Sequence, residues 1–238
     1  MPNEPHIRSV FDHDLDAVKA QVGRMGGLVE KALLNAAEAL ETGDLTLAMQ
    51  VRADDKIIDG LEDMIQSECA RIIALRSPIA SDLRTVLTVM RMAGALERSG
   101  DYAKNLAKRT MVLTEMRPIP GAAAAIKRMT RAVVQMLSNA LNAYFTEDAV
   151  LAEEVRQSDR EIDQLYNSLF REFLTHMMED PRNITACMHL HFIAKNIERV
   201  GDHDTGIAEQ VLYLVTGRMP EEDRAKGDDM SLGAPHKD

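Results

Sequence analysis

The sequence contains few of the residues that interrupt helices or favour strands. It has no tryptophan, 4% aromatic residues and 8 prolines among 238 residues. Alanine, leucine and methionine are plentiful instead, and these side chains lose less rotamer freedom in a helix than aromatic or β-branched side chains do. The composition therefore predicts an all-α protein.

Cysteine and long apolar runs are also scarce. Cys69 and Cys187 lie far apart within helical patterns, where cysteine usually serves as a small buried hydrophobic residue. Two thiols do not form a disulfide framework, which indicates a reducing compartment. The N-terminal segment has no apolar signal-peptide core, and no run of about 18 uncharged residues could span a membrane. We therefore expect a soluble, cytoplasmic protein.

Positive charge is in short supply, since the formal net charge is −10. Nucleic-acid-binding proteins normally carry a basic excess that displaces counterions from phosphates, so we predict no nucleic-acid partner, although scattered arginines could form a local patch. The sequence also lacks the GxxxxGK[ST] phosphate loop and the nucleophile elbow of two large enzyme classes. We predict that the protein is not an enzyme.

The chain contains two copies of one unit. Residues 25–59 align with residues 129–163 without a gap, and the identities include Asp55 with Asp159 and Asp59 with Asp163. Further along, ALERSGDYAKNLA at 95–107 aligns with NIERVGDHDTGIA at 196–208. Because both matches occur in the same order, the sequence predicts a tandem duplication.

Each copy is predicted to form three long helices. They cover 11–41, 44–76 and 79–113 in the first copy and 121–146, 148–178 and 182–215 in the second, and glycine or proline marks most of the breaks. Connections this short make neighbouring helices antiparallel. The expected fold is two tandem three-helix bundles, at 8–116 and 117–216. A disordered tail is expected at 217–238, which is rich in Gly, Pro and acidic residues.

Acidic residues recur four positions apart on the second and third helices of both copies. This spacing puts two side chains on one helix face, about 6 Å apart. A solvated acidic face would explain any single pair. On the third helix, however, Glu97 and Asp101 fall within the apolar stripe, outside which three arginines cluster at 84, 91 and 98. The pairs are Asp55 and Asp59, Glu97 and Asp101, Asp159 and Asp163, and Glu198 and Asp202.

The register of the predicted hairpins brings these pairs together. If Asp59 faces Glu97 across antiparallel helices, the first hairpin is centred on Pro78. The equivalent pairing in the second copy is centred on the Asp-Pro turn at 180–181. Both centres coincide with a predicted turn. We therefore expect four carboxylates to converge at one helix–helix seam in each copy.

Carboxylates that face a bundle must be paired or coordinated, because isolated buried charge is very costly. Oxygen ligands suit hard cations, with iron, manganese or magnesium as the first candidates, whereas zinc would more often recruit His or Cys and is an alternative. The competing explanation is neutralisation by arginine, since Arg98, Arg199, Arg52 and Arg156 repeat beside the acids. The sequence thus predicts metal ions at both seams.

The duplicated unit resembles the PhoU family of phosphate-transport accessory regulators. The likeness rests on DLR at 82–84, which opens the third helix, and on the segments ERSGDYAKNLA and ERVGDHDTGIAE, and it spans about residues 8–216. It implies two PhoU repeats, each with a multinuclear metal cluster on paired E/D-x-x-x-D segments that map onto the eight acids named above. Tyr102 and Gly206 replace the His and Asn usual in the family, so equal affinity at the two sites is not implied.

The resemblance also implies a cytoplasmic, often dimeric protein that restrains phosphate uptake and the phosphate-starvation response. The implied partners are the ATPase subunit of the phosphate ABC transporter and a phosphate-sensing histidine kinase, through which alone it would reach the membrane. Two other functions stay open, a carboxylate-bridged metalloenzyme and a metal-free helical scaffold. Diiron enzymes in helical bundles normally add Glu-x-x-His on two helices, a spacing that is absent here.

Overall fold

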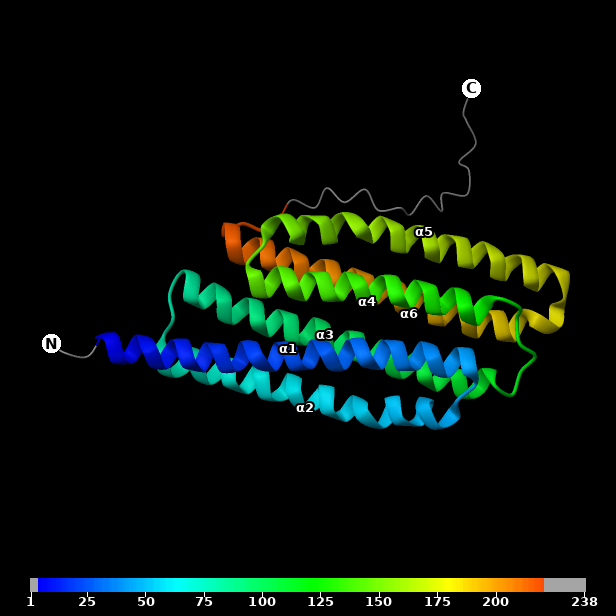
Figure 1. Cartoon of the computed structure of the whole chain (residues 1–238), viewed down its shortest axis with the longest axis horizontal. Helices are drawn as coiled ribbons and strands as arrows, with labels where there is room; N and C mark the ends of the chain where they lie inside the picture. Colours follow the sequence, from blue (N-terminus) through cyan, green and yellow to red (C-terminus); the bar gives the residue numbers. More distant parts are fainter. Residues whose placement is uncertain (1–3, 221–238) are drawn as a thin grey trace, which may run out of the picture.

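The computed structural model describes residues 4–220 as six long helices, and no strand occurs within that range (Figure 1). This confirms the all-α fold and its two three-helix units. Of the tail predicted at 217–238, residues 221–238 lie outside the described residues. The helices are α1 (Glu4–Thr42), α2 (Leu45–Arg76), α3 (Ser81–Leu113), α4 (Ala122–Thr146), α5 (Ala149–Glu179) and α6 (Ile184–Thr216), with one 3₁₀ turn at Pro181–Asn183.

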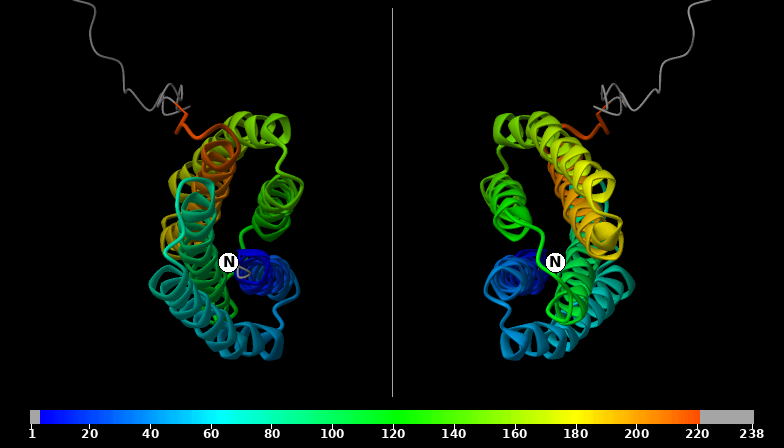
Figure 2. Two further views of the ribbon diagram at one scale, coloured as in Figure 1. Left: turned by 90° about the vertical axis from the view of Figure 1, so that its left-hand side faces the viewer. Right: turned by 90° about the vertical axis from the view of Figure 1, so that its right-hand side faces the viewer.

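The two repeats pack side by side rather than end to end. Helices α1–α3 form one repeat and α4–α6 the other, and they meet through α1 against α4 and α3 against α6. Seen end-on, α3 and α6 make one long side of the molecule, α1 and α4 make the other, and α2 and α5 lie at opposite poles (Figure 2). The α2–α3 and α5–α6 seams therefore lie on either side of the central α3–α6 pair.

The helix boundaries follow from local chemistry. Asp44 and Asp148, at equivalent positions in the two repeats, cap α2 and α5 by accepting backbone N–H groups through their side chains. The first helix begins at Glu4 rather than at residue 11, and Pro5 lies in its first turn, where proline is tolerated. The third begins at Ser81 rather than at residue 79, because positive φ angles at Ser77 and Ala80 turn the chain there.

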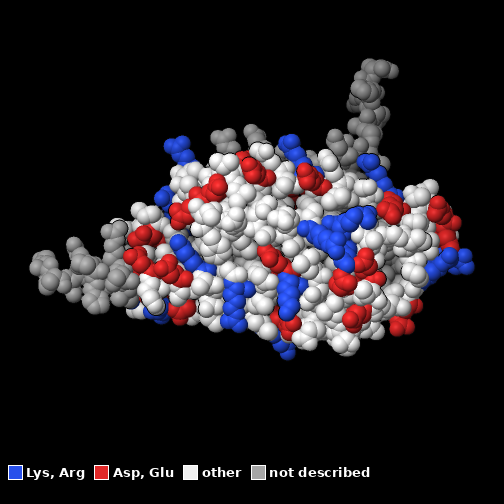
Figure 3. Space-filling model, in the orientation of Figure 1, with Lys and Arg blue, Asp and Glu red and all other residues white. Residues whose placement is uncertain are grey.

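One continuous core runs through both repeats. It is made mostly of Ala, Val, Leu, Ile and Met side chains from all six helices. Cys69 and Cys187 are buried in it as free thiols, as the sequence predicts. No helix within residues 4–220 is both long and apolar enough to cross a bilayer. On the face that carries α1, α4 and α5, acidic and basic side chains are interspersed (Figure 3).

A pair of glycines sets how closely α1 approaches α4. A Cβ added to Gly23 would lie 3.0 Å from Cζ of Phe145, and one added to Gly26 would collide with Cδ1 of Leu141. The repeat-2 counterpart of Gly26 is Thr130, so this notch belongs to the first repeat alone. Small residues here let the side chains of α4 rest on the backbone of α1.

We expect Gly26→Leu to lower the free energy of unfolding by about 1–3 kcal/mol, because overpacking forces neighbouring side chains and backbone to shift. Gly27→Leu is the matched control, since Gly27 is exposed and nothing lies within 4 Å of its added Cβ. Urea titration followed by circular dichroism measures both. Equal stability of the two variants would show that the notch does not fix the distance between the repeats.

Candidate metal sites

In the first repeat, Asp55 is the most buried of the predicted ligands. Its side chain is 3% exposed, and Nζ of Lys104 lies 2.5 Å from its Oδ2. The same ammonium lies 3.2 Å from Oδ1 of Asp101, so one lysine links α2 to α3 across the seam. These hydrogen bonds, the one to Asp55 above all, raise the pKa of Lys104. The buried Oδ1 of Asp55 has no hydrogen-bond partner.

Asp59 and Glu97 complete the acidic group of this seam. Burial raises the pKa of both carboxyls, and repulsion from neighbouring acids raises them further. The charges of Asp55 and Asp101 raise the pKa of Asp59, and those of Asp101 and Asp59 raise the pKa of Glu97. The four acids that the sequence singles out in this repeat therefore lie along one seam, but they do not form a group arranged to hold an ion.

The second repeat has the same acids in a different setting. Burial, followed by repulsion from Asp202 and Asp163, raises the pKa of Glu198, while Nζ of Lys195 lies 2.7 Å from its Oε1. Asp159 lies beside the backbone of α6, with Oδ1 3.6 Å from the position of a Cβ on Gly201. Asp202 differs from the expectation, because it is exposed at the edge of the seam.

Asp204 is an acid that the sequence reading missed. It is fully buried on α6, and neither of its carboxylate oxygens has a hydrogen-bond partner. Burial raises its pKa well above the ordinary value, and repulsion from Asp159 and Glu30 adds to the shift. Its counterpart in the first repeat is the buried Ala103. An acid at a position where the other copy has a core alanine is the signal that could have revealed it.

Lysines make close contacts with two of the acids, since Nζ of Lys104 lies 2.5 Å from Asp55 and Nζ of Lys195 lies 2.7 Å from Glu198. Arg98 lies 3.7 Å from Glu97 but is 66% exposed, and Arg156 is engaged by Glu153 and Glu209. The lysines do not repeat. Lys104 is replaced in the second copy by threonine at 205, and Lys195 aligns with glycine at 94. The two seams are therefore neutralised by different residues.

Gly100 and Gly201, which stand at equivalent places, allow the seams to close. A Cβ on Gly100 would lie 3.1 Å from Cδ1 of Ile58, and one on Gly201 would lie 3.4 Å from Cγ2 of Ile162. The contact at Gly100 is tighter than ordinary van der Waals packing, whereas the one at Gly201 is an ordinary contact with no space to spare. Close approach of α2 to α3, and of α5 to α6, explains why both copies accept the helix-weakening effect of glycine.

The comparisons with known proteins agree with the duplicated architecture. The family model described as the PhoU domain matches residues 22–110 and again residues 126–211, once in each repeat. The chain belongs to the PhoU family. A PhoU homologue from Rhizobium meliloti is 43% identical over 223 residues, which cover 94% of this chain and 94% of the relative. One from Zymomonas mobilis is 46% identical over 225 residues, which cover 93% of each chain. Both carry the name phosphate-specific transport system accessory protein PhoU homolog.

Two solved PhoU structures have the same fold. The crystal structure of PhoU from Pseudomonas aeruginosa superposes with a TM-score of 0.84 at 40% identity, covering 87% of this chain and 100% of that one. The phosphate transport system regulatory protein PhoU from Streptococcus pneumoniae gives a TM-score of 0.82 at 30% identity, covering 89% and 99%. Both likenesses extend over the two repeats together.

The donor chemistry of the PhoU seams fits a hard cation, since carboxylate oxygens are the ligands such ions prefer. The unpartnered, buried Oδ1 of Asp55 is a free ligand position in that set. With Lys104 placed between Asp55 and Asp101, however, no three His, Cys, Asp or Glu side chains among the described residues are arranged to hold an ion. A cation in the first repeat would therefore have to displace the ammonium of Lys104.

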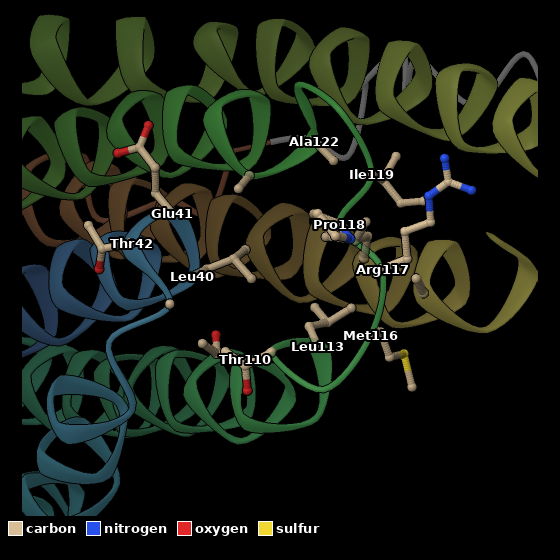
Figure 4. A pocket seen from close by; sticks show the side chains of 15 residues that line it. Leu40, Glu41, Thr42, Thr110, Leu113, Met116, Arg117, Pro118, Ile119 and Ala122 are labelled. Atoms are coloured by element: carbon tan, nitrogen blue, oxygen red, sulfur yellow. The ribbon is translucent and has the colours of Figure 1, made fainter.

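The PhoU fold also contains an apolar cavity of about 440 Å³ where the two repeats are joined (Figure 4). It lies between the α1–α2 turn, the end of α3, the linker and the starts of α4 and α6. Leu40, Leu113 and Ile119 contribute apolar side chains, while Glu41 and Arg117 lie at its rim. Its lining is mostly apolar and does not bring several ionisable groups together.

Proposed function

We propose that this PhoU protein is a negative regulator of phosphate uptake and of the phosphate-starvation response, and that it acts as a metal-binding adaptor rather than an enzyme. The names of its relatives support the process, since they are accessory or regulatory proteins of phosphate transport. The buried, unpartnered oxygen of Asp55 at a four-carboxylate seam is the observation that carries the metal part of the proposal.

The proposed ligands are the four acids of each seam. They would take iron, manganese or magnesium, with zinc as an alternative, because all the donors are oxygens. In the first seam the ion would supply the positive charge that Lys104 now supplies to Asp55 and Asp101. The proposed ligands are Asp55, Asp59, Glu97 and Asp101, and Asp159, Asp163, Glu198 and Asp202.

The proposed partners are the ATPase subunit of the phosphate ABC transporter and a phosphate-sensing histidine kinase. We place the protein in the cytoplasm, as a homodimer that reaches the membrane only through these partners. A metal-free scaffold is the second candidate, and one observation favours it. Lys104 and Lys195 already give each seam a counter-ion, at 2.5 Å from Asp55 and 2.7 Å from Glu198.

We expect the double variant Glu97→Ala with Asp101→Ala to lose about half of the bound metal, because it removes two of the four donors at one of the two seams. Elemental analysis of protein purified without chelator measures this. The control is Asp12→Ala with Asp16→Ala, which removes two exposed acids at the same spacing from α1. Unchanged metal content in the seam variant would rule out the first site.

The adaptor role is tested by affinity purification from detergent-solubilised membranes that contain the phosphate transporter and the sensor kinase. Recovery of the transporter ATPase or of the kinase with the tagged protein is the expected result. Recovery of neither would contradict the adaptor role. The same purification from a strain that lacks the transporter controls for nonspecific capture.

A further inference from the structure

Three arginines fall outside the apolar stripe of α3, and one of them, Arg98, lies 3.7 Å from the seam acid Glu97. Arg84, Arg91 and Arg98 are seven residues apart, so they lie on one face of the helix, separated by about 10 Å along its axis. Arg109 falls on the same face of α3, and Arg199 is the counterpart of Arg98 on α6. We call these five residues the arginine stripe. In a chain with a net charge of −10, such a row of one sign is unexpected.

Contacts between α3 and α6 fix where the stripe lies. Nη1 of Arg91 donates to Oε1 of Gln210 at 3.2 Å, and the guanidinium of Arg109 lies 4.5 Å from the ring centroid of Phe192. Tyr102 and His203 stack with ring centroids 5.8 Å apart, one helical turn after Arg98 and Arg199 respectively, which puts these two arginines on either side of the ring pair. The stripe therefore follows the α3–α6 pair along its length, on helices that lie behind α1 and α4 in Figure 1.

Apolar side chains accompany the arginines on this surface. Leu87 is 36% exposed and lies on the same face of α3 as Arg84 and Arg91. Met188 and Phe192 of α6 are 38% and 44% exposed near Arg109. Between Arg91 and Arg98 the surface is shallow, because nothing lies within 4 Å of a Cβ added to Gly94. The stripe is thus both basic and apolar, with room for a close backbone approach.

We propose that the arginine stripe docks an acidic amphipathic helix of a partner protein, with carboxylates against the arginines and apolar side chains against Leu87 and Phe192. A helix repeats its faces at the same interval as the stripe, and its width of about 10 Å matches a strip bounded by two packed helices. Charge complementarity and the guanidinium's fit to carboxylates supply the recognition.

The borders of the stripe argue against a broader polyanion. Glu97 lies 3.7 Å from Arg98 on one side, and Asp202 is exposed on the other. A nucleic-acid duplex or an anionic bilayer would meet these acids as well as the arginines, whereas a single helix can lie between them. The inference rests on the proposed adaptor function, for which it supplies the contact surface.

Charge reversal separates this inference from the adaptor role itself. In the membrane purification, we expect Arg91→Glu with Arg98→Glu to weaken binding of the transporter ATPase or of the sensor kinase about tenfold or more. Arg160→Glu with Arg171→Glu makes the same change in charge on the exposed face of α5 and should retain binding. Thermal melting confirms that both variants fold. If the stripe variant retains both partners, the proposal that the stripe is the docking site is wrong and the adaptor role stands. If the wild type recovers neither, both fail.

Crosslinking identifies the chemistry of the occupant. A photoreactive benzoylphenylalanine replaces Leu87 on the stripe, and in a control it replaces Leu165 on α5, which has a similar exposed fraction. We expect the Leu87 probe alone to label a helical segment of the ATPase or kinase with carboxylates spaced three, four or seven residues apart. Crosslinks to lipid, to nucleic acid or to a segment without such carboxylates would overturn the proposal.

Discussion

Lys104→Met is expected to destabilise the metal-free protein by about 1–3 kcal/mol and to make its stability depend on added divalent cations. Removing the ammonium leaves Asp55 buried without a counter-ion, and breaking a buried pair on one side usually costs more than the pair contributes. The lower end of the range allows for the 40% exposure of Lys104, through which water can reach the seam. Methionine preserves the length and apolar stem of the lysine side chain.

The rescue by metal is the informative part of this experiment. An ion that binds only the folded state raises stability with its concentration. We therefore expect Mn²⁺ or Mg²⁺ to raise the melting temperature of Lys104→Met more than that of the wild type, in which the ammonium competes for the same carboxylates. Lys108→Met, which changes an exposed lysine on the same helix, should behave like the wild type. An equal response of all three proteins would contradict a metal site between Asp55 and Asp101.

Asp204→Ala is expected to raise the free energy of unfolding by about 1–3 kcal/mol at neutral pH. A buried carboxyl without hydrogen bonds costs roughly that amount, and alanine is the residue that the first repeat has at the same place. The neighbouring Asp202→Ala, at an exposed position, should change stability by less than about 0.5 kcal/mol. A loss of stability in Asp204→Ala would mean that this carboxyl has a stabilising partner after all.

The pH dependence provides a second test of Asp204. Its pKa is raised in the folded protein, so between the unfolded and folded pKa values the folded state binds more protons. Stability must then fall as pH rises above the unfolded value of about 4, until the folded pKa is passed. Chelator-treated wild-type protein should show this loss, and Asp204→Ala should lack it. Identical pH profiles for the two proteins would assign the loss to other groups.

The duplication made much of the fold predictable. The positions of the helices, the hairpin turns and the acids at the seams could be predicted from residues that both copies share. An alignment of the chain with itself identifies the features that occur twice. The capping residues Asp44 and Asp148 are an example, since each begins its helix where the repeat predicts. Gly100 and Gly201 likewise owe their place to close helix packing, as their repetition inside a helix indicates.

The same comparison hid the residues that differ between the copies. Lys104, Lys195 and Asp204 each occur in one repeat only, and they decide how the buried charge is balanced. The reach of a lysine across a seam also depends on its rotamer, which spacing along one helix does not reveal. Asp202 was expected at the second seam because it aligns with Asp101, yet it lies at the exposed edge. Four residues turn a helix by about 400°, so Asp202 lies about 40° farther round α6 than Glu198, at the margin of the seam.

The antiparallel crossing of α3 and α6 has an evolutionary consequence. Tyr102 and His203, which are counterparts in the two copies, stack against each other there with ring centroids 5.8 Å apart. An interface that pairs a surface with its own copy is the mark of a symmetric dimer, so a single ancestral unit could associate with itself through this contact before the two were joined. In such a dimer every substitution appears in both subunits. Once the two units are joined in one chain, each half can change separately and acquire its own lysine.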